Sequence, residues 1–232
     1  GALPLSALEL AAREMCDFEG SGMSILEHSH RGRVYDAVHA EAKALLTAVL
    51  GIPDSHEVLF LHGGASLQFA ALPLQFLPDG GEAHYLVQGT WGKKAKSEAE
   101  PVAAMFGAKV SATEAAKAPD GSYPEVVGAS AIRLPERCSY LHVTSNETIH
   151  GLQYGFSEPI PTTTALGRPE VPLLCDMSSD FLWRPLDVTN YAFLYAGAQK
   201  NVGPSGLCVA IANKAFIQSG RKSLPQSLRY DI

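Results

Sequence analysis

The sequence predicts an α/β fold with a mainly parallel seven-stranded sheet flanked by helices. Seven short apolar runs recur along the 232 residues, and helical or loop segments separate them. Most of the runs are apolar on both faces instead of alternating, which is typical of strands that are covered on both sides. Strands that alternate with helices indicate a single α/β sheet. The predicted strands are 58–61, 83–87, 108–111, 140–143, 172–175, 192–195 and 207–211.

Two helices are predicted before the first strand. Residues 3–15 and 35–50 carry apolar side chains at helical spacing, and Gly51 supplies a stop for the second helix. Residues 67–76 form the next predicted helix, and another helical stretch begins at Trp91. These segments supply the layers expected to cover the sheet.

Two stretches carry no helical or strand periodicity. Residues 115–132 contain a Pro-Asp-Gly turn signal, and residues 157–172 contain four prolines and a Thr-Thr-Thr run. We interpret residues 115–132 as a surface excursion and residues 157–172 as a loop within the domain, and no internal repeat or low-complexity tract is evident.

Composition excludes several functional classes. With 46% hydrophobic and 18% charged residues the chain is typical of a globular protein, and its net charge of −6 gives no footprint for nucleic acid or an anionic membrane. No apolar run approaches the roughly 20 residues that span a bilayer. Four widely spaced cysteines are expected to be free thiols in a reducing compartment, which predicts a cytoplasmic protein. They are Cys16, Cys138, Cys175 and Cys208.

Lys200 and Asp176 are the most informative pair in the chain. Each follows a predicted strand, so both are expected at the carboxyl edge of the sheet, where α/β proteins bind ligands. Pyridoxal phosphate (PLP) requires a lysine amine to hold its aldehyde as a Schiff base and a carboxylate to keep its pyridine nitrogen protonated. The alternatives are a solvated lysine and an aspartate that caps a helix or forms a turn. Small residues around Lys200, at 196–198 and 203–206, favour a bound flat ligand.

Three further positions are candidates for cofactor contacts. The His-Gly-Gly-Ala-Ser run at 62–66 leads from a strand into a helix, where free N–H groups and a partial positive charge suit a phosphate. Trp91 is suited to stack on a ring, and Thr148 to bond a phenolic oxygen. By sequence alone, an ordinary turn, a core tryptophan and a turn residue remain open at these positions.

The His-Ser-His-Arg run at 28–31 suggests anion binding more than metal binding. No third ligand stands at a recognisable spacing from the two histidines, so we predict no metal site. Arg31 pairs well with carboxylate or phosphate through its planar guanidinium group. No nucleophile elbow is present, and hydrolase chemistry has little support.

Taken together, five segments resemble the phosphoserine aminotransferase family, a class-V, fold-type I group of PLP enzymes. The resemblance runs in order along the whole chain, and the Ser-His-Arg and Ala-Gly-Ala-Gln-Lys-Asn motifs are the most specific. The segments are GMSILEHSHR at 22–31, FLHGGASLQF at 60–69, SNETI at 145–149, DMSSD at 176–180 and AGAQKNVGP at 196–204.

The resemblance implies an aminotransferase that moves an amino group between glutamate and 3-phosphohydroxypyruvate, giving 3-phosphoserine and 2-oxoglutarate in serine biosynthesis. It implies a homodimer with shared active sites. Residues 1–232 would form the PLP-binding large domain, with 1–20 a candidate contribution to the small-domain side. The family continues beyond residue 232 of this chain, so we expect the small C-terminal domain to be missing.

The resemblance also implies residue roles. Lys200 would form the Schiff base, and Asp176 would face the pyridinium nitrogen. The remaining contacts would come from Trp91 to the ring, Thr148 to its 3-hydroxyl, Ala65, Ser66 and Gln199 to the phosphate, and Arg31 with His30 to substrate anions, in the neighbouring subunit's site.

Three other interpretations stay open from the sequence. A cysteine desulfurase of the same fold group needs a reactive cysteine on a loop, and the strand-like surroundings of Cys175 and Cys208 do not favour one. An alanine-glyoxylate-type aminotransferase is the second alternative. The third is a catalytically inactive PLP-domain fragment, whose motifs would look the same.

Overall fold

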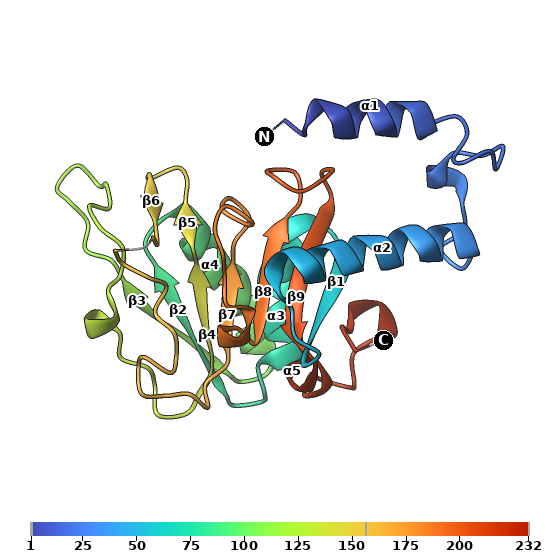
Figure 1. Ribbon diagram of the computed structural model, residues 1–232. Coiled ribbons are helices and arrows are strands. Elements are labelled where there is room, and N and C mark those ends of the chain that lie inside the picture. The colour runs from blue at the N-terminus through green and yellow to red at the C-terminus, as the bar shows by residue number, and fades with distance from the viewer. Residues whose placement is uncertain (1, 156, 232) are drawn as a thin grey trace.

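The computed structural model describes residues 2–155 and 157–231, and its centre is a seven-stranded sheet in the order β1-β9-β8-β7-β4-β2-β3 (Figure 1). β9 is antiparallel to its neighbours β1 and β8, whereas the other strands run parallel to one another. The strands are β1 (His56–His62), β2 (Glu82–Val87), β3 (Lys109–Glu114), β4 (Cys138–Thr144), β7 (Leu173–Asp176), β8 (Phe193–Gly197) and β9 (Leu207–Asn213).

The predicted sheet is therefore confirmed, since each of the seven apolar runs overlaps one of its strands. β7 and β8 are buried along their whole length, as their apolar sequences indicate. A short hairpin of β5 (Asn146–Glu147) and β6 (Leu152–Gln153) follows β4 and was not predicted. Two-residue strands are too short for periodicity to reveal them.

The predicted helices are present, with shifted ends. α2 (Arg33–Leu50) ends at Gly51, which adopts the left-handed conformation with φ +61°. α3 (Gly64–Phe76) begins three residues before its predicted start, because the two glycines of the 62–66 run make its first turn. The other helices are α1 (Leu5–Glu14), α4 (Thr90–Met105) and α5 (Lys214–Gln218), with short 3-10 turns at η1 (Ile25–Glu27), η2 (Ala129–Ala131), η3 (Val188–Asn190) and η4 (Gln226–Leu228).

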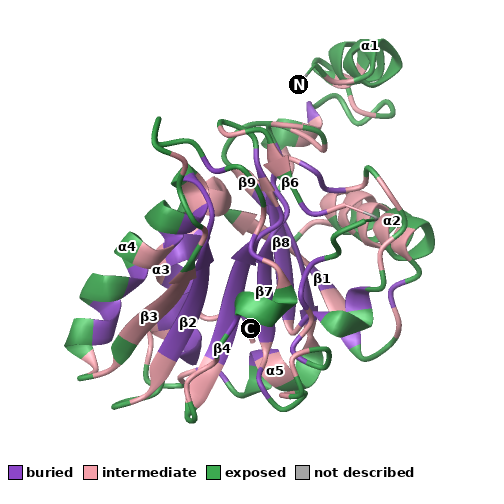
Figure 2. Cartoon of the chain, turned by 90° about the vertical axis from the view of Figure 1, so that its left-hand side faces the viewer, coloured by how far each residue is buried: buried purple, intermediate pink, exposed green. Residues whose placement is uncertain are grey.

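The two faces of the sheet are covered differently. Helices α3, α4 and α5 pack on one face, over a core that includes Leu72, Tyr85 and Tyr195 (Figure 2). The other face is covered mostly by irregular chain, together with Leu46 and Leu50 at the end of α2. Both predicted loop stretches supply part of this cover, so their apolar residues serve as core and not as surface.

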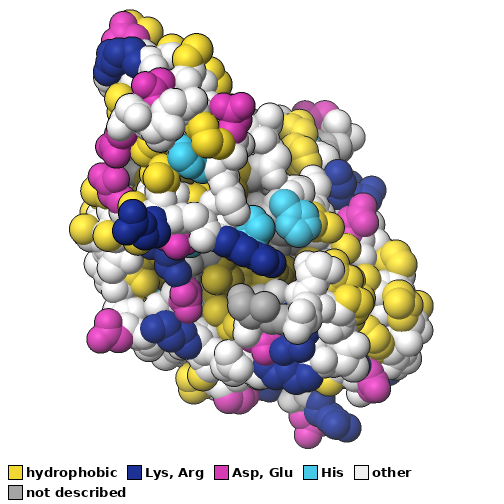
Figure 3. Space-filling view, turned by 90° about the vertical axis from the view of Figure 1, so that its right-hand side faces the viewer, with side chains coloured by type: hydrophobic (Ala, Val, Ile, Leu, Met, Phe, Trp, Pro, Cys, Tyr) yellow, Lys and Arg dark blue, Asp and Glu magenta, His cyan; other side chains and the backbone are white. Residues whose placement is uncertain are grey.

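The N-terminal segment stands away from this body. α1 projects from the sheet and contains no buried residue, and its Leu5 is 70% exposed (Figures 1 and 3). The assignment of residues 1–20 to the small-domain side stays a prediction. Across the described residues, no helix has the length and hydropathy that a membrane crossing requires.

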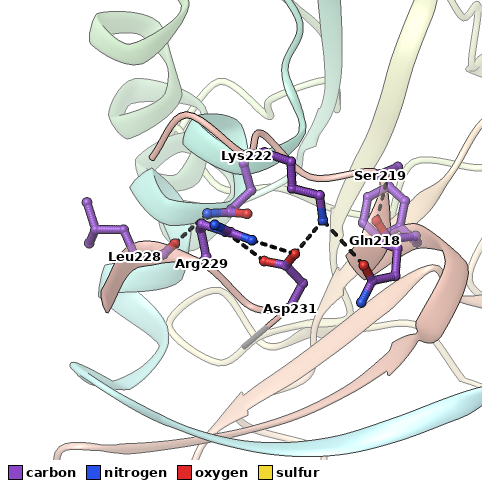
Figure 4. A network of polar contacts seen from close by, with 8 residues as sticks. Gln218, Ser219, Lys222, Leu228, Arg229 and Asp231 are labelled. Carbon is purple, nitrogen blue, oxygen red and sulfur yellow. Dashed lines mark hydrogen bonds and ion pairs between the residues drawn. The ribbon is translucent and has the colours of Figure 1, made fainter. Parts of the chain in front are cut away.

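The C-terminal segment folds back onto α3. The Tyr230 hydroxyl donates to Oε1 of buried Gln68 at 2.5 Å, and the Tyr230 ring lies 5.1 Å from the ring of Phe193. Beside it, Arg229 pairs with Asp231 through two hydrogen bonds of 2.9 and 2.8 Å (Figure 4). These contacts fix the last described residues against the helical face of the sheet.

Candidate active site

A cavity of about 260 Å³ opens at the carboxyl edge of the parallel strands, beside the first turns of α3 and α4. This is the edge at which α/β sheets bind ligands. Six of the residues predicted from sequence to contact a cofactor line the cavity, namely Ala65, Ser66, Trp91, Asp176, Gln199 and Lys200. Segments separated by up to 135 positions in the chain therefore meet at one place.

Asp176 ends β7 and is only 4% exposed. Its Oδ1 accepts hydrogen bonds from the backbone N–H of Ser178 at 2.9 Å and from the Ser178 hydroxyl at 2.5 Å. The Ser178 Oγ in turn accepts from the N–H of Gly197, at the end of β8, at 2.9 Å. Burial raises the pKa of Asp176 to about 6, although the Ser178 donors and the charge of Lys200 oppose that rise.

Lys200 lies in the turn that follows β8. Its Nζ is 5.4 Å from the centre of the Trp91 ring, at the first turn of α4. This distance allows a cation–π contact. The amine and the aromatic face therefore share the wall of the cavity next to Asp176.

The start of α3 forms another wall. Gly63 and Gly64 adopt left-handed φ values of +81° and +60°, and the Gly64 N–H donates to the Gly206 carbonyl at 3.1 Å. The first N–H groups of a helix have no partner within the helix, so those of Ala65 and Ser66 are suited to an anion. The sequence at 62–66 is thus a helix start on the cavity and not an isolated turn.

Thr148, Arg31 and His30 do not line this cavity. Thr148 is exposed in the turn between β5 and β6, while His30 and Arg31 are exposed in the segment before α2. Their roles stay predictions. Among the described residues no cluster of three or more His, Cys, Asp or Glu side chains is arranged to hold a metal ion.

The structure adds site residues that the sequence reasoning missed. Thr144 lines the cavity from the end of β4, next to Asp176 in register, and its buried Oγ1 has no hydrogen-bond partner in the described structure. Glu147 is fully buried and accepts hydrogen bonds from the N–H groups of Trp91 and Gly92. A glycine on either side of Thr90-Trp91 was the available signal, because close approach of another segment requires small residues.

None of the strand cysteines Cys138, Cys175 and Cys208 lines the cavity. Burial raises the pKa of Cys138 to about 11 and that of Cys208 to about 12, and it raises the pKa of Cys175 well above the ordinary range. A thiol nucleophile needs the opposite shift. Cys16 is exposed in the N-terminal segment, which the cavity does not include.

Comparison with known proteins gives consistent matches along the chain. The family model described as aminotransferase class-V matches residues 3–227. A phosphoserine aminotransferase of Niallia circulans is 45% identical over 230 residues, which are 99% of this chain and 59% of that protein. This chain thus spans about three fifths of the length of such curated relatives.

Solved structures of phosphoserine aminotransferases are similar to this chain over its whole length. Phosphoserine aminotransferase from Bacillus circulans subsp. alkalophilus superposes with a TM-score of 0.86 at 44% identity, covering all of this chain and 60% of that one. PLP-bound phosphoserine aminotransferase from Trichomonas vaginalis gives a TM-score of 0.84 at 35% identity, over 99% of this chain and 61% of that one.

Proposed function

The chain belongs to the class-V aminotransferase family, and we propose that it transfers an amino group between glutamate and 3-phosphohydroxypyruvate with PLP as cofactor. The products are 2-oxoglutarate and 3-phosphoserine, which gives the protein a role in serine biosynthesis. The observation that carries the proposal is the meeting of Lys200, Asp176 and Trp91 around one cavity. The curated relatives named phosphoserine aminotransferase supply the substrate class.

The donor set of the cavity fits this cofactor. The cavity offers an amine for an aldehyde and a buried carboxylate for a ring nitrogen. It also offers an aromatic face for a ring and a glycine-rich helix start for a phosphate. The unpartnered hydroxyl of Thr144 adds a polar atom that a bound polar ligand would satisfy. When bound, the cofactor supplies an aldehyde that captures the amino group and a ring that withdraws electrons.

Each residue then has a distinct task. Lys200 would hold the cofactor's aldehyde through Nζ, and as a free amine Nζ would take the proton from the substrate's α-carbon. Asp176 carries the negative charge that keeps a ring nitrogen protonated, and Ser178 fixes its orientation through Oδ1. Trp91, which lines the cavity, would stack on the cofactor's ring.

We also propose that the protein acts as a cytoplasmic homodimer in which Arg31 and His30 bind substrate anions in the partner's cavity. Their exposed position outside their own subunit's cavity supports this assignment. Mixing the inactive variants Arg31→Ala and Lys200→Ala tests it, since a mixed dimer has one cavity with neither lesion. Activity should reappear on mixing, and no recovery would count against shared sites.

Covalent trapping tests the function itself. Borohydride reduction of the PLP-loaded protein should fix the cofactor to Lys200, as peptide mass mapping would show. Lys200→Ala should abolish both the label and turnover with glutamate and 3-phosphohydroxypyruvate, whereas Lys109→Ala, on the exposed start of β3, should retain both. Turnover by the Lys200 variant close to that of the parent would overturn the assignment.

The alternatives give different results in the same assays. A desulfurase would turn over cysteine. The raised pKa values of the strand thiols in this chain weigh against that chemistry. An alanine-glyoxylate-type enzyme would prefer alanine to phosphoserine. An inactive fragment would form no label at Lys200.

A further inference from the structure

A buried carboxylate holds the start of α4. Glu147 on β5 has no exposed surface, and its Oε2 and Oε1 accept hydrogen bonds from the backbone N–H groups of Trp91 at 2.9 Å and Gly92 at 2.6 Å. The residue in the N-cap position, Gly89, has no side chain with which to cap the helix. The capping carboxylate therefore comes from a segment 55 positions later in the chain.

The charge of Glu147 is stabilised by the helix itself. No ion pair between described residues includes Glu147, and a buried carboxylate without partners is costly. The positive end of a 16-residue helix and two N–H donors offset that cost. The first turn of α4, which carries Trp91, is thereby tied to β5.

The glycines around Trp91 fit this contact. A Cβ atom at Gly89 would lie 2.5 Å from Cδ of Glu147, and one at Gly92 would lie 2.7 Å from the Leu86 carbonyl oxygen. Both distances are shorter than real Cβ contacts allow. The glycines of the Gly-Thr-Trp-Gly sequence thus leave the space that the Glu147 side chain occupies.

The same short segment is anchored to the Asp176 wall of the cavity. The Ser145 backbone N–H donates to the Asp176 carbonyl at 2.9 Å, and the Ser179 hydroxyl donates to the Asn146 carbonyl at 3.0 Å. Residues 145–147 consequently connect the end of β7 to the start of α4.

We propose that Glu147 is a positioning residue that fixes the Trp91 indole against the cavity and holds it in register with Asp176. The part of this inference that concerns the cofactor rests on the proposed function. The part that concerns Trp91 does not, because it is a statement about the cofactor-free protein.

The first test uses fluorescence without cofactor. The chain has two tryptophans, so Trp183→Phe leaves Trp91 as the only tryptophan emitter. Glu147→Gln keeps the shape of the side chain but replaces one of the two accepting oxygens by an NH₂ group. That group faces a backbone N–H, which is also a donor. We expect the acrylamide quenching constant of Trp91 to rise about twofold as the first turn of α4 loosens. Gly89→Ala, which displaces the same carboxylate, should give a change of the same sign.

Asp187→Asn is the matched control. Asp187 caps η3 by accepting from the Thr189 N–H at 3.0 Å, and it does not line the cavity. This variant should leave Trp91 quenching unchanged. Unchanged quenching in Glu147→Gln, with native circular dichroism retained, would overturn the proposal.

The second test measures PLP binding in a double-mutant cycle. Glu147→Gln should weaken PLP about tenfold and reduce its induced circular dichroism. In a Trp91→Ala background, which keeps the backbone N–H groups, the same substitution should weaken PLP by less than about twofold. Equal weakening in both backgrounds would mean that Glu147 does not act through Trp91. Failure of the parent to bind PLP would refute the proposed function instead and leave the fluorescence result to decide the role of Glu147.

Discussion

Replacing Asp176 by asparagine should stabilise the cofactor-free protein at neutral pH. Burial raises the pKa of this carboxyl from its ordinary value of 3.8 to about 6, so the folded state disfavours the charged form. Between about pH 4 and pH 6 the folded chain therefore binds more protons than the unfolded chain. The free energy of unfolding consequently falls as the pH rises through this window.

The magnitude follows from the width of the window. A difference of about two pH units at 1.36 kcal/mol per unit corresponds to about 3 kcal/mol of destabilisation above pH 6. The asparagine carbonyl oxygen can still accept from both Ser178 donors, so the amide removes the charge and retains the geometry. The free energy of unfolding of Asp176→Asn should then be higher than that of the parent by up to about 3 kcal/mol at pH 7.5. Near pH 4 the two free energies should be equal.

Urea denaturation of cofactor-free protein at several pH values measures this difference. Asp187→Asn is again the control, because donors from Thr189 hold the pKa of its exposed carboxyl below the usual range and the pH trend has the opposite sign. A stability difference for Asp176→Asn that is absent at pH 7.5, or that does not change between pH 4 and pH 7.5, would refute the reasoning. The same variant should lose transaminase activity, since an amide carries no charge to hold a ring nitrogen protonated.

Three further outcomes are expected. Ser178→Ala removes the hydroxyl donor to Asp176 and keeps the backbone N–H donor, which should raise the pKa of that carboxyl further and weaken PLP about tenfold, as a spectroscopic titration would detect; unchanged affinity would contradict the orienting role. Tyr230→Phe leaves buried Gln68 without the hydroxyl that it accepts from and should cost about 1–2 kcal/mol in denaturant unfolding, whereas a neutral result would show that the C-terminal contact contributes little. A thiol reagent should modify Cys16 quickly in the native protein and the buried Cys175 and Cys208 only on unfolding; early modification of either buried thiol would contradict their packing.

The sheet was predictable because its strands are buried on both faces. A strand such as β8, which is covered along its whole length, reads as a continuous apolar run. The cover of the second face was not predictable in the same way, since the loop stretches 115–132 and 157–172 pack through scattered apolar residues without a period. The hairpin of β5 and β6 is set by contacts with other segments and not by local propensity.

The site was predictable where chemistry follows strand ends. Asp176 is the last residue of β7, and Lys200 lies in the turn that follows β8, so parallel topology brings both to one edge. Glu147 escaped because its partner in the helix start lies 55 positions away, and Gly89 and Gly92 indicate a close approach without showing which segment makes it. Thr144 escaped because its significance is an unpartnered hydroxyl, which only the packed structure reveals.

The separation of Lys200 from Asp176 ties these observations to the chemistry. No ion pair among the described residues includes Lys200, and the Oδ1 of Asp176 is occupied by Ser178. Neutral donors therefore orient the carboxylate in place of the lysine, while the lysine lies over the Trp91 ring 5.4 Å away. Ser178 and Trp91 thus give the carboxylate and the amine separate anchors on the wall of one cavity.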